Sequence, residues 1–357
     1  MMTPSIRKAG GASGSASPGR LHWRGWRSGP KRLLVAVIVL AGMTMATAAP
    51  ASAKTTTQQQ QQQVTYVANS GGDSVSVIDT VTNTVIDTIT VGDGPSALAI
   101  NPAGTRVYVA NATSGTVSVI DTSTNTVIAT ITVGANPTGL AVTPGGTRVY
   151  VANTNTDNVS VIDTSTNTVI DTITVGDAPI GVAVTPGATR VYVANSGSDN
   201  VSVISTATNT VTDTITVGDN PQELAVTPGA TRVYVANSGS DNVSVISTAT
   251  NTVTDTITVG DAPRAVAVTP GGTRVYVTNQ GTDDVSVIST ATNTVTTTIT
   301  VGDNPQGVAV TQGGTRVYVT NTGADNVSVI STATNTVTGT ITVGDAPIGV
   351  DSGLIPE

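Results

Sequence analysis

Hydrophobic and polar residues alternate in short runs along most of this chain. In the window from 179 to 219, four such runs follow one another, at 181–185, 190–194, 201–204 and 210–217. Each run is rich in Val, Ile and Thr, and each is bounded by Gly, Pro, Asn or Ser. This period of two, interrupted by turn residues, is typical of antiparallel β-strands. No window shows the apolar period of a helix, so we expect an all-β protein.

The pattern repeats with a fixed interval of 42 residues. The seven tyrosines of the chain mark it, each within a Tyr-Val-Ala-Asn or Tyr-Val-Thr-Asn tetrapeptide: Tyr66, Tyr108, Tyr150, Tyr192, Tyr234, Tyr276 and Tyr318. Residues 64–357 therefore form seven units without insertion or deletion. We assign the tyrosines a structural role, since residues 54–357 contain no Phe or Trp and tyrosine is their largest packing element.

Four strands repeated seven times predict a seven-bladed β-propeller of four-stranded antiparallel blades. A linear solenoid would need polar caps at its ends, and neither end has one. Instead, the first unit begins inside its second strand at Val64, and the last supplies a spare first strand at 347–350. We expect this strand to complete the N-terminal blade and close the ring. Because Asp351-Ser352-Gly353 replaces the usual continuation, the closing strand is expected to be short and to fray.

The first 53 residues read as a secretory signal peptide with a long n-region. They carry seven Lys or Arg and no acid, followed by an apolar run at 33–41 and Ala51-Ser52-Ala53. The run is shorter than the roughly 20 apolar residues of a transmembrane anchor. We therefore expect cleavage near Ala53 and a secreted or cell-surface protein with no transmembrane anchor in its mature form.

Residues 54–63 are rich in Thr and Gln and predict a disordered linker. Beyond Ala53 the chain has eight basic residues against 23 acidic ones, a formal charge of −15. This balance argues against a nucleic-acid partner. We expect a monomer, with a cell-envelope polymer or a protein ligand as the candidate partner.

Composition also restricts the chemistry. Residues 54–357 contain neither His nor Cys, which excludes nucleophile–His–acid triads and His/Cys metal sites there. We expect no cofactor, although Ser198-Asp199-Asn200 and Gly218-Asp219-Asn220 offer oxygen ligands that would suit calcium. Asx-turn formation is the simpler explanation of these loops. Residues 183–219 and 225–261 are identical over 37 positions, which argues against an individualised catalytic centre.

Arginines recur at the same interval just after the first turn of each unit: Arg106, Arg148, Arg190, Arg232, Arg274 and Arg316. A ring of arginines could bind an anion, but we expect each to pair with an acid or carbonyl of a neighbouring blade. Arg264 is the exception to this register, since it follows Gly260-Asp261-Ala262-Pro263.

Comparison of the repeats with one another shows where they differ. Variation is concentrated in the loop after the tyrosine strand and in the connection between blades, and both sets should open on one face. On three consecutive blades this face would present Gln222, Glu223, Arg264 and Gln306 around the channel mouth. We predict that these four residues bind a ligand; neutral drift in solvated loops is the alternative.

The repeated Tyr-Val-Ala/Thr-Asn, Val-Ser-Val-Ile and Thr-Ile-Thr-Val-Gly-Asp segments closely resemble the YVTN-repeat, surface-layer-type β-propeller family over residues 64–350. The resemblance implies a secreted or cell-surface seven-bladed propeller with proposed binding, adhesion or envelope functions. Related propellers include lactonase-like and lyase enzymes, whose His, Glu or metal-ligand sites have no counterpart that we can map here.

Two functions follow as expectations. The main one is a binding or scaffold propeller without catalytic activity that recognises its partner through the variable face. The alternative is a lactonase-like hydrolase with an Asp-bound metal at the central channel.

Overall fold

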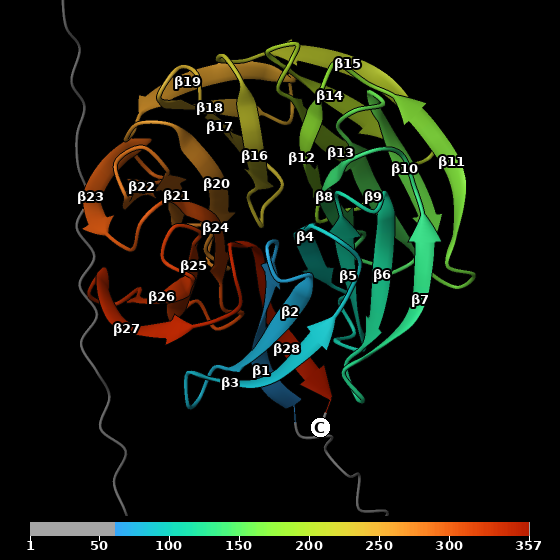
Figure 1. Cartoon of the computed structure of the whole chain (residues 1–357). Helices are drawn as coiled ribbons and strands as arrows, with labels where there is room; N and C mark the ends of the chain where they lie inside the picture. The colour runs from blue at the N-terminus through green and yellow to red at the C-terminus, as the bar shows by residue number, and fades with distance from the viewer. Residues whose placement is uncertain (1–60, 357) are drawn as a thin grey trace, which may run out of the picture. The chain divides into compact units, whose positions relative to one another are not determined.

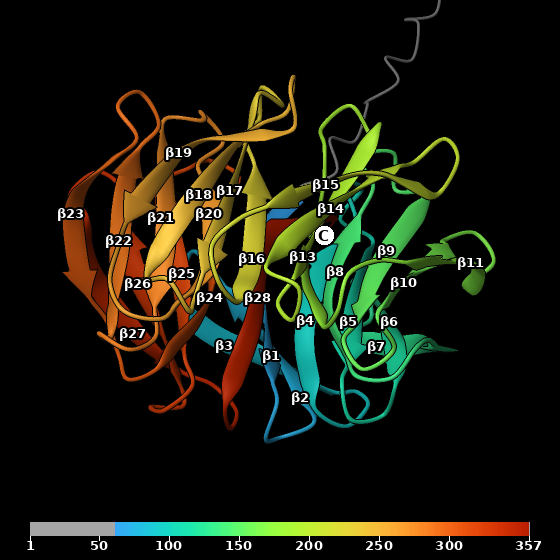
Figure 2. The same ribbon diagram turned by 90° about the horizontal axis from the view of Figure 1, so that it is seen from above.

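A computed structural model describes residues 61–356 of the chain, so the predicted signal peptide at 1–53 and most of the predicted linker at 54–63 lie outside the described residues. All 28 elements are β-strands, arranged in seven four-stranded antiparallel sheets. Figure 1 shows these sheets following one another as blades around a common axis, and Figure 2 shows the same ring from above. The predicted seven-bladed propeller is confirmed.

In six blades the strands run outward from the axis in chain order, and in the closing blade β28 lies inside β1, β2 and β3. The innermost strands are β4 (Pro95–Ile100), β8 (Pro137–Val142), β12 (Pro179–Val184), β16 (Pro221–Val226), β20 (Pro263–Val268), β24 (Pro305–Val310) and β28 (Pro347–Pro356). The second strands, which carry the tyrosines, are β1 (Gln61–Asn69), β5 (Arg106–Asn111), β9 (Arg148–Asn153), β13 (Arg190–Asn195), β17 (Arg232–Asn237), β21 (Arg274–Asn279) and β25 (Arg316–Asn321).

The remaining two strands of each blade lie further from the axis. The third strands are β2 (Ser74–Asp79), β6 (Thr116–Asp121), β10 (Asn158–Asp163), β14 (Asn200–Ser205), β18 (Asn242–Ser247), β22 (Asp284–Ser289) and β26 (Asn326–Ser331). The outer strands are β3 (Thr84–Thr90), β7 (Thr126–Thr132), β11 (Thr168–Thr174), β15 (Thr210–Thr216), β19 (Thr252–Thr258), β23 (Thr294–Thr300) and β27 (Thr336–Thr342).

The core lies between successive blades. Both faces of every second strand are buried, because Val and Tyr alternate along a strand that is sandwiched between two neighbours. Tyr234 is fully buried, and its hydroxyl donates to Asn293 Oδ1 of the next blade at 3.0 Å. The outer strand keeps one buried residue, such as Ile257, while its threonines face solvent. The tyrosines therefore hold neighbouring blades together, as predicted.

Arg232 illustrates the contact that the six repeated arginines make between blades. Its Nη1 donates to the main-chain carbonyl of Thr290 on the next blade at 2.6 Å. Each of the five other arginines in this register donates to the equivalent carbonyl of the next blade. Arg316 of the last blade donates to Thr80 of the first, so the same contact also joins the blades at the ring closure. The predicted structural role of these arginines is confirmed.

The ring is closed by β28, which pairs antiparallel with β1 in the sheet order β28-β1-β2-β3. Figure 1 shows β28 in red beside β1 in blue. The expectation of a short, frayed closing strand was wrong, since β28 spans ten residues and is the longest strand described. Gln61–Gln63, assigned to the linker, instead extend β1 and pair with Leu354–Pro356, and this extension buries Ile355 in the first blade's core.

Candidate functional site

A cavity of about 340 Å³ lies where the innermost strands surround the axis. Its mouth includes Ser70 and Thr113, from the turns after second strands, and Gly94, from a connection between blades. The same two kinds of loop meet elsewhere in the ring: the Ser238 amide, in the turn after β17, donates to the carbonyl of Asn220 in the preceding connection at 3.1 Å. The cavity therefore opens on the face that carries the variable loops.

Each innermost strand presents the residue after its proline to this cavity, and five of the seven strands also present the next residue. The first position is occupied in ring order by Ser96, Thr138, Ile180, Gln222, Arg264, Gln306 and Ile348. The second position holds Ala97, Gly139, Gly181, Glu223, Ala265, Gly307 and Gly349. One position further along the strands, Leu98, Leu140, Val266, Val308 and Val350 form an apolar floor. The sequence of the lining thus varies although the scaffold around it is repeated.

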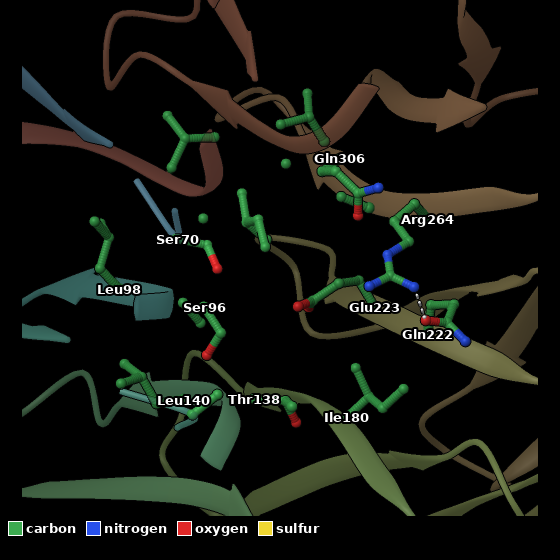
Figure 3. A pocket seen from close by; sticks show the side chains of 18 of the residues that line it. Ser70, Ser96, Leu98, Thr138, Leu140, Ile180, Gln222, Glu223, Arg264 and Gln306 are labelled. Carbon is green, nitrogen blue, oxygen red and sulfur yellow. Dashed lines mark hydrogen bonds between the residues drawn. The ribbon is translucent and has the colours of Figure 1, made fainter. Parts of the chain in front are cut away.

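Glu223 has no counterpart in the other six blades, which carry only Gly or Ala at its position. Four of these residues are glycines that lie against the neighbouring strand; a Cβ on Gly139 would lie only 2.0 Å from the carbonyl oxygen of Ile180. Such crowding favours small residues at this position. The side chain of Glu223 is therefore an exception to the packing that the other six blades share. Glu223 remains partly accessible and lines the cavity, and Figure 3 shows its carboxylate extending toward the middle.

Arg264 lies beside Glu223 and is held by Gln222. Its Nη1 donates to Gln222 Oε1 at 2.7 Å across the interface of two blades. The amide nitrogen of Gln222 in turn donates to Asn220 Oδ1 at 2.7 Å, which fixes the orientation of the amide. Figure 3 shows the guanidinium of Arg264 between the Gln222 and Glu223 side chains. Gln222 is therefore a positioning residue for Arg264.

Gln306 supplies an unused acceptor to the same cavity. Its Nε2 donates to Asn304 Oδ1 at 2.9 Å, whereas its Oε1 has no protein partner. The side chain is only 7% exposed, so this oxygen depends on a donor from a bound water or ligand.

Burial dominates the electrostatics of the acid and the base. It raises the pKa of Glu223 to about 7, although the positive charge of Arg264 and a main-chain hydrogen bond from Leu224 both act in the opposite direction. Burial also lowers the pKa of Arg264 from its ordinary value, and the Glu223 carboxylate opposes that change. An arginine remains protonated under such conditions. Near neutral pH the cavity thus holds a permanent cation beside a carboxyl group that can accept or release a proton.

The structure brings all four sequence-predicted ligand-binding residues, Gln222, Glu223, Arg264 and Gln306, to one cavity on three consecutive blades. The residues of the other wall, Ser96, Thr138, Ile180 and Ile348, were not among the predicted ligand-binding residues. Glu223 was predicted only together with its neighbours, although the restriction of the other six repeats to Gly or Ala was a signal that could have distinguished it.

The two loops considered for calcium make protein contacts instead. Asp199 Oδ1 accepts a hydrogen bond from the Asn220 amide at 2.8 Å, and the Asp219 amide donates to Ser240 Oγ at 2.8 Å. Across residues 61–356, no group of three or more Asp or Glu side chains is arranged to hold a metal ion. The same part of the chain also contains no helix long and apolar enough to cross a membrane.

Comparison with known proteins places this architecture in a family. The family model of the YNCE-like beta-propeller matches residues 28–145 and 177–271, which is more than half of the chain. The chain belongs to the YNCE-like beta-propeller family. A model for the lactonase family, described as a 7-bladed beta-propeller, matches residues 249–354 of this YNCE-like propeller.

Individual relatives share the fold but little sequence. Over 37 residues the YNCE-like propeller is 60% identical to PE-PGRS family protein PE_PGRS18 of Mycobacterium tuberculosis (strain ATCC 25618 / H37Rv), which covers 10% of this chain and 8% of that protein. A proposed 6-phosphogluconolactonase from Bacteroides fragilis NCTC 9343 superposes with a TM-score of 0.71 at 18% identity, covering 82% of this chain and 98% of the other. Another from Bacteroides uniformis ATCC 8492 gives 0.71 at 16% identity, covering 82% and 100%.

Hydrazine synthase from Kuenenia stuttgartiensis also resembles the YNCE-like propeller, with a TM-score of 0.67 at 22% identity over 74% of this chain and 96% of that one. At such identities the structural likeness shows the fold alone. The family matches nevertheless correct our main functional expectation. The match of residues 249–354 to the lactonase-family model favours the lactonase-like alternative over a scaffold without catalytic activity.

Proposed function

We propose that this protein is a hydrolase of cyclic esters and that the reaction takes place in the channel cavity. The observation that carries the proposal is the position of Glu223, a lone carboxylate in a ring of Gly and Ala, beside the guanidinium of Arg264. A carboxyl group whose environment shifts it toward neutral pH, next to a fixed cation in a cavity, is a common arrangement at catalytic sites. The similarity to lactonase-type propellers supports the same conclusion.

In the proposed reaction, Glu223 acts as general base and Arg264 as the electrostatic stabiliser. Glu223 takes a proton from a water molecule as its oxygen forms a bond to the carbonyl carbon of the lactone. The negative charge that develops on the carbonyl oxygen is stabilised by Arg264, whose position Gln222 fixes. The ring C–O bond then breaks, and Glu223 returns the proton to the leaving alkoxide. The product is an open-chain hydroxy acid.

We also propose that residues 1–53 are a signal peptide removed near Ala53, so that the hydrolase acts outside the cytoplasm, and that the chain is a YVTN-repeat member of its family. The order of a basic segment, an apolar run and Ala-Ser-Ala supports export. The seven tetrapeptides support the finer family assignment. N-terminal sequencing of the protein recovered from the culture medium or cell surface tests the cleavage point.

The catalytic proposal is tested with Glu223→Ala and a panel of γ- and δ-lactones, measured as acid release above spontaneous hydrolysis. Ala stands at the same position in two other blades, so the variant is expected to fold. We expect kcat to fall by roughly 100-fold or more, as is typical when a general base is lost. A matched control is Ile170→Thr on the outer strand, since units four to seven carry Thr there. Full activity in Glu223→Ala would refute the assignment.

A further inference from the structure

The cavity has two walls of different chemistry. Gln222, Glu223, Arg264 and Gln306 lie on the adjacent strands β16, β20 and β24. The other side is built by β28, β4, β8 and β12, which present Ile348, Ser96, Thr138 and Ile180, with Leu98 and Leu140 on the floor. Figure 3 shows Leu98 and Leu140 across the space from Arg264, with Ile180 on the side of Gln222.

The charged groups of the polar wall are few. Among the described residues that line the cavity, Arg264 is the one basic side chain and Glu223 the one acidic side chain. When Glu223 is ionised, the two charges balance, and no further cation is present in the lining to neutralise a phosphate dianion. Glu223 would also repel such a group at short range. The arrangement therefore suits the single negative charge that develops on a lactone carbonyl and disfavours a phosphorylated substrate.

The apolar wall offers few hydrogen bonds to a polyhydroxylated ring. Leu98 and Leu140 are 6% and 8% exposed, and what remains accessible belongs to the cavity floor. Ser96 Oγ already donates to the Pro137 carbonyl at 2.9 Å, and Thr138 Oγ1 is 2.7 Å from Thr154 Oγ1, so both hydroxyls are engaged with protein atoms. Sugar hydroxyls placed here would lose water contacts without equivalent replacements, which is unfavourable.

We propose that the substrate is a lactone that carries a short alkyl substituent, with its ester group at Glu223 and Arg264 and its alkyl group against Ile180, Ile348 and the Leu98–Leu140 floor. This inference rests on the proposed hydrolytic function. The enclosed volume of about 340 Å³ is at the lower end of the range for small-ligand sites, roughly 300–1,000 Å³, and limits the length of the substituent. Phosphorylated and polyhydroxylated sugar lactones are predicted to be poor substrates.

The test measures kcat/KM for a series of 6-alkyl δ-lactones of increasing chain length, together with δ-gluconolactone and 6-phosphogluconolactone. Each added methylene is expected to raise kcat/KM about two- to fourfold until the cavity is full, the size of the transfer effect for one buried methylene. A flat or falling series, or faster hydrolysis of either sugar lactone, would overturn the inference.

Variants of the apolar wall connect this preference to the structure. Ile180→Thr and Ile348→Thr place at these positions the residue that Thr138 already supplies at the equivalent position of another blade. Each is expected to reduce the gain in kcat/KM per added methylene. Ile170→Thr, on the exposed outer strand, is the matched control and should preserve the full gain per methylene.

Binding of the corresponding 6-alkyl δ-lactams separates this inference from the catalytic proposal, because a lactam resists hydrolysis. Calorimetric affinity that rises with chain length in the wild type, and rises less in Ile180→Thr, would support an alkyl-binding wall even if every lactone were left intact. In that case the catalytic proposal alone would fail. Lactam binding that is absent or independent of chain length would refute the alkyl-binding wall.

Discussion

Asp351 Oδ2 accepts a hydrogen bond from the main-chain amide of Ile100 at 2.9 Å and so joins the innermost strands β28 and β4 at the ring closure. The other six blades carry Ala at the position of Asp351. Burial raises the pKa of this carboxyl group to about 6, even though the hydrogen bonds from Ile100 and Ser352 favour its ionised form. The closing blade therefore contains a half-buried carboxyl group at a position where every other blade has Ala.

Asp351→Asn is predicted to stabilise the protein at neutral pH. Because the folded-state pKa lies above the ordinary value of 3.8, the wild-type carboxyl contributes most to stability below pH 4, and this contribution is lost as the pH rises through about 6. Asn keeps an acceptor for Ile100 and does not titrate. The difference in the free energy of unfolding between Asp351→Asn and the wild type should shift in favour of the variant by on the order of 1–2 kcal/mol between pH 4 and 7.5. Urea denaturation at both pH values measures this difference; parallel pH dependences would contradict it.

The pH dependence of catalysis should follow Glu223. The proposed base works when deprotonated, so kcat/KM is expected to rise about tenfold per pH unit below a midpoint near 7 and to level off above it. Glu223→Gln should remove this rising limb together with most of the activity. Rates corrected for spontaneous lactone hydrolysis from pH 5 to 9 provide the measurement, and a pH-independent wild-type rate would exclude Glu223 as the base.

Arg264→Gln tests the second catalytic role. The equivalent positions of the two flanking blades hold Gln222 and Gln306, so the substitution suits the scaffold. Loss of the guanidinium should lower kcat about 10²–10³-fold, the usual effect of removing one stabiliser of a developing oxyanion. The substitution should also move the midpoint of the residual pH profile above 7, because in the wild type the charge of Arg264 lowers the Glu223 pKa. A lower rate with an unchanged midpoint would show that Arg264 does not act on Glu223.

Arg232 provides a prediction for the scaffold alone. Its hydrogen bonds to the Thr290 carbonyl at 2.6 Å and to Asn293 Oδ1 at 3.3 Å tie one blade to the next. Arg232→Ala should lower the free energy of unfolding by roughly 1–3 kcal/mol, since it leaves these acceptors without their charged donor. Lactone hydrolysis by the folded variant should stay at the wild-type rate. Thermal unfolding followed by circular dichroism tests the first expectation, and an unchanged midpoint would contradict it.

Ile355 offers a test of the closing strand. It is 6% exposed and belongs to the core of the first blade. Ile355→Ala is expected to cost about 2–4 kcal/mol, as for other buried aliphatic truncations. Ile86→Ala, on the outer strand of the same blade and 49% exposed, is the control and should cost far less. Equal effects of the two substitutions would mean that the end of β28 contributes little to closure.

The sequence predicted the propeller well because its repeats are nearly identical. The alternation around Tyr192 and the turn residues on either side placed each strand to within about two residues, and the fixed period of 42 made the number of blades certain. The in-register arginines were also interpreted correctly, since a charge repeated in every blade must find the same partner in every blade.

Local pattern was less informative where the repeat is broken. Asp351-Ser352-Gly353 looked unsuited to a strand, yet β1 holds them by main-chain hydrogen bonds that do not depend on side-chain type. The pairing of Gln61–Gln63 with the same strand is likewise a tertiary effect that composition cannot reveal. For the site, the sequence identified the polar residues, but only the ring order places Ser96 and Thr138 across the cavity from Arg264, with Ile180 and Ile348 two blades away on either side.

The separation between lining and scaffold has an evolutionary consequence. The residue after each innermost proline faces the cavity, whereas the Tyr, Asn and Arg contacts that join blades lie on other strands or on the main chain. A substitution at Ile180 can therefore change the ligand while the Tyr and Arg contacts between blades remain in place. Duplication of a blade copies the contacts that join it to its neighbours. A few later substitutions at the cavity-lining positions are then enough for the copied blade to contribute different side chains to the site. New substrate preferences can in this way arise one blade at a time within an unchanged ring.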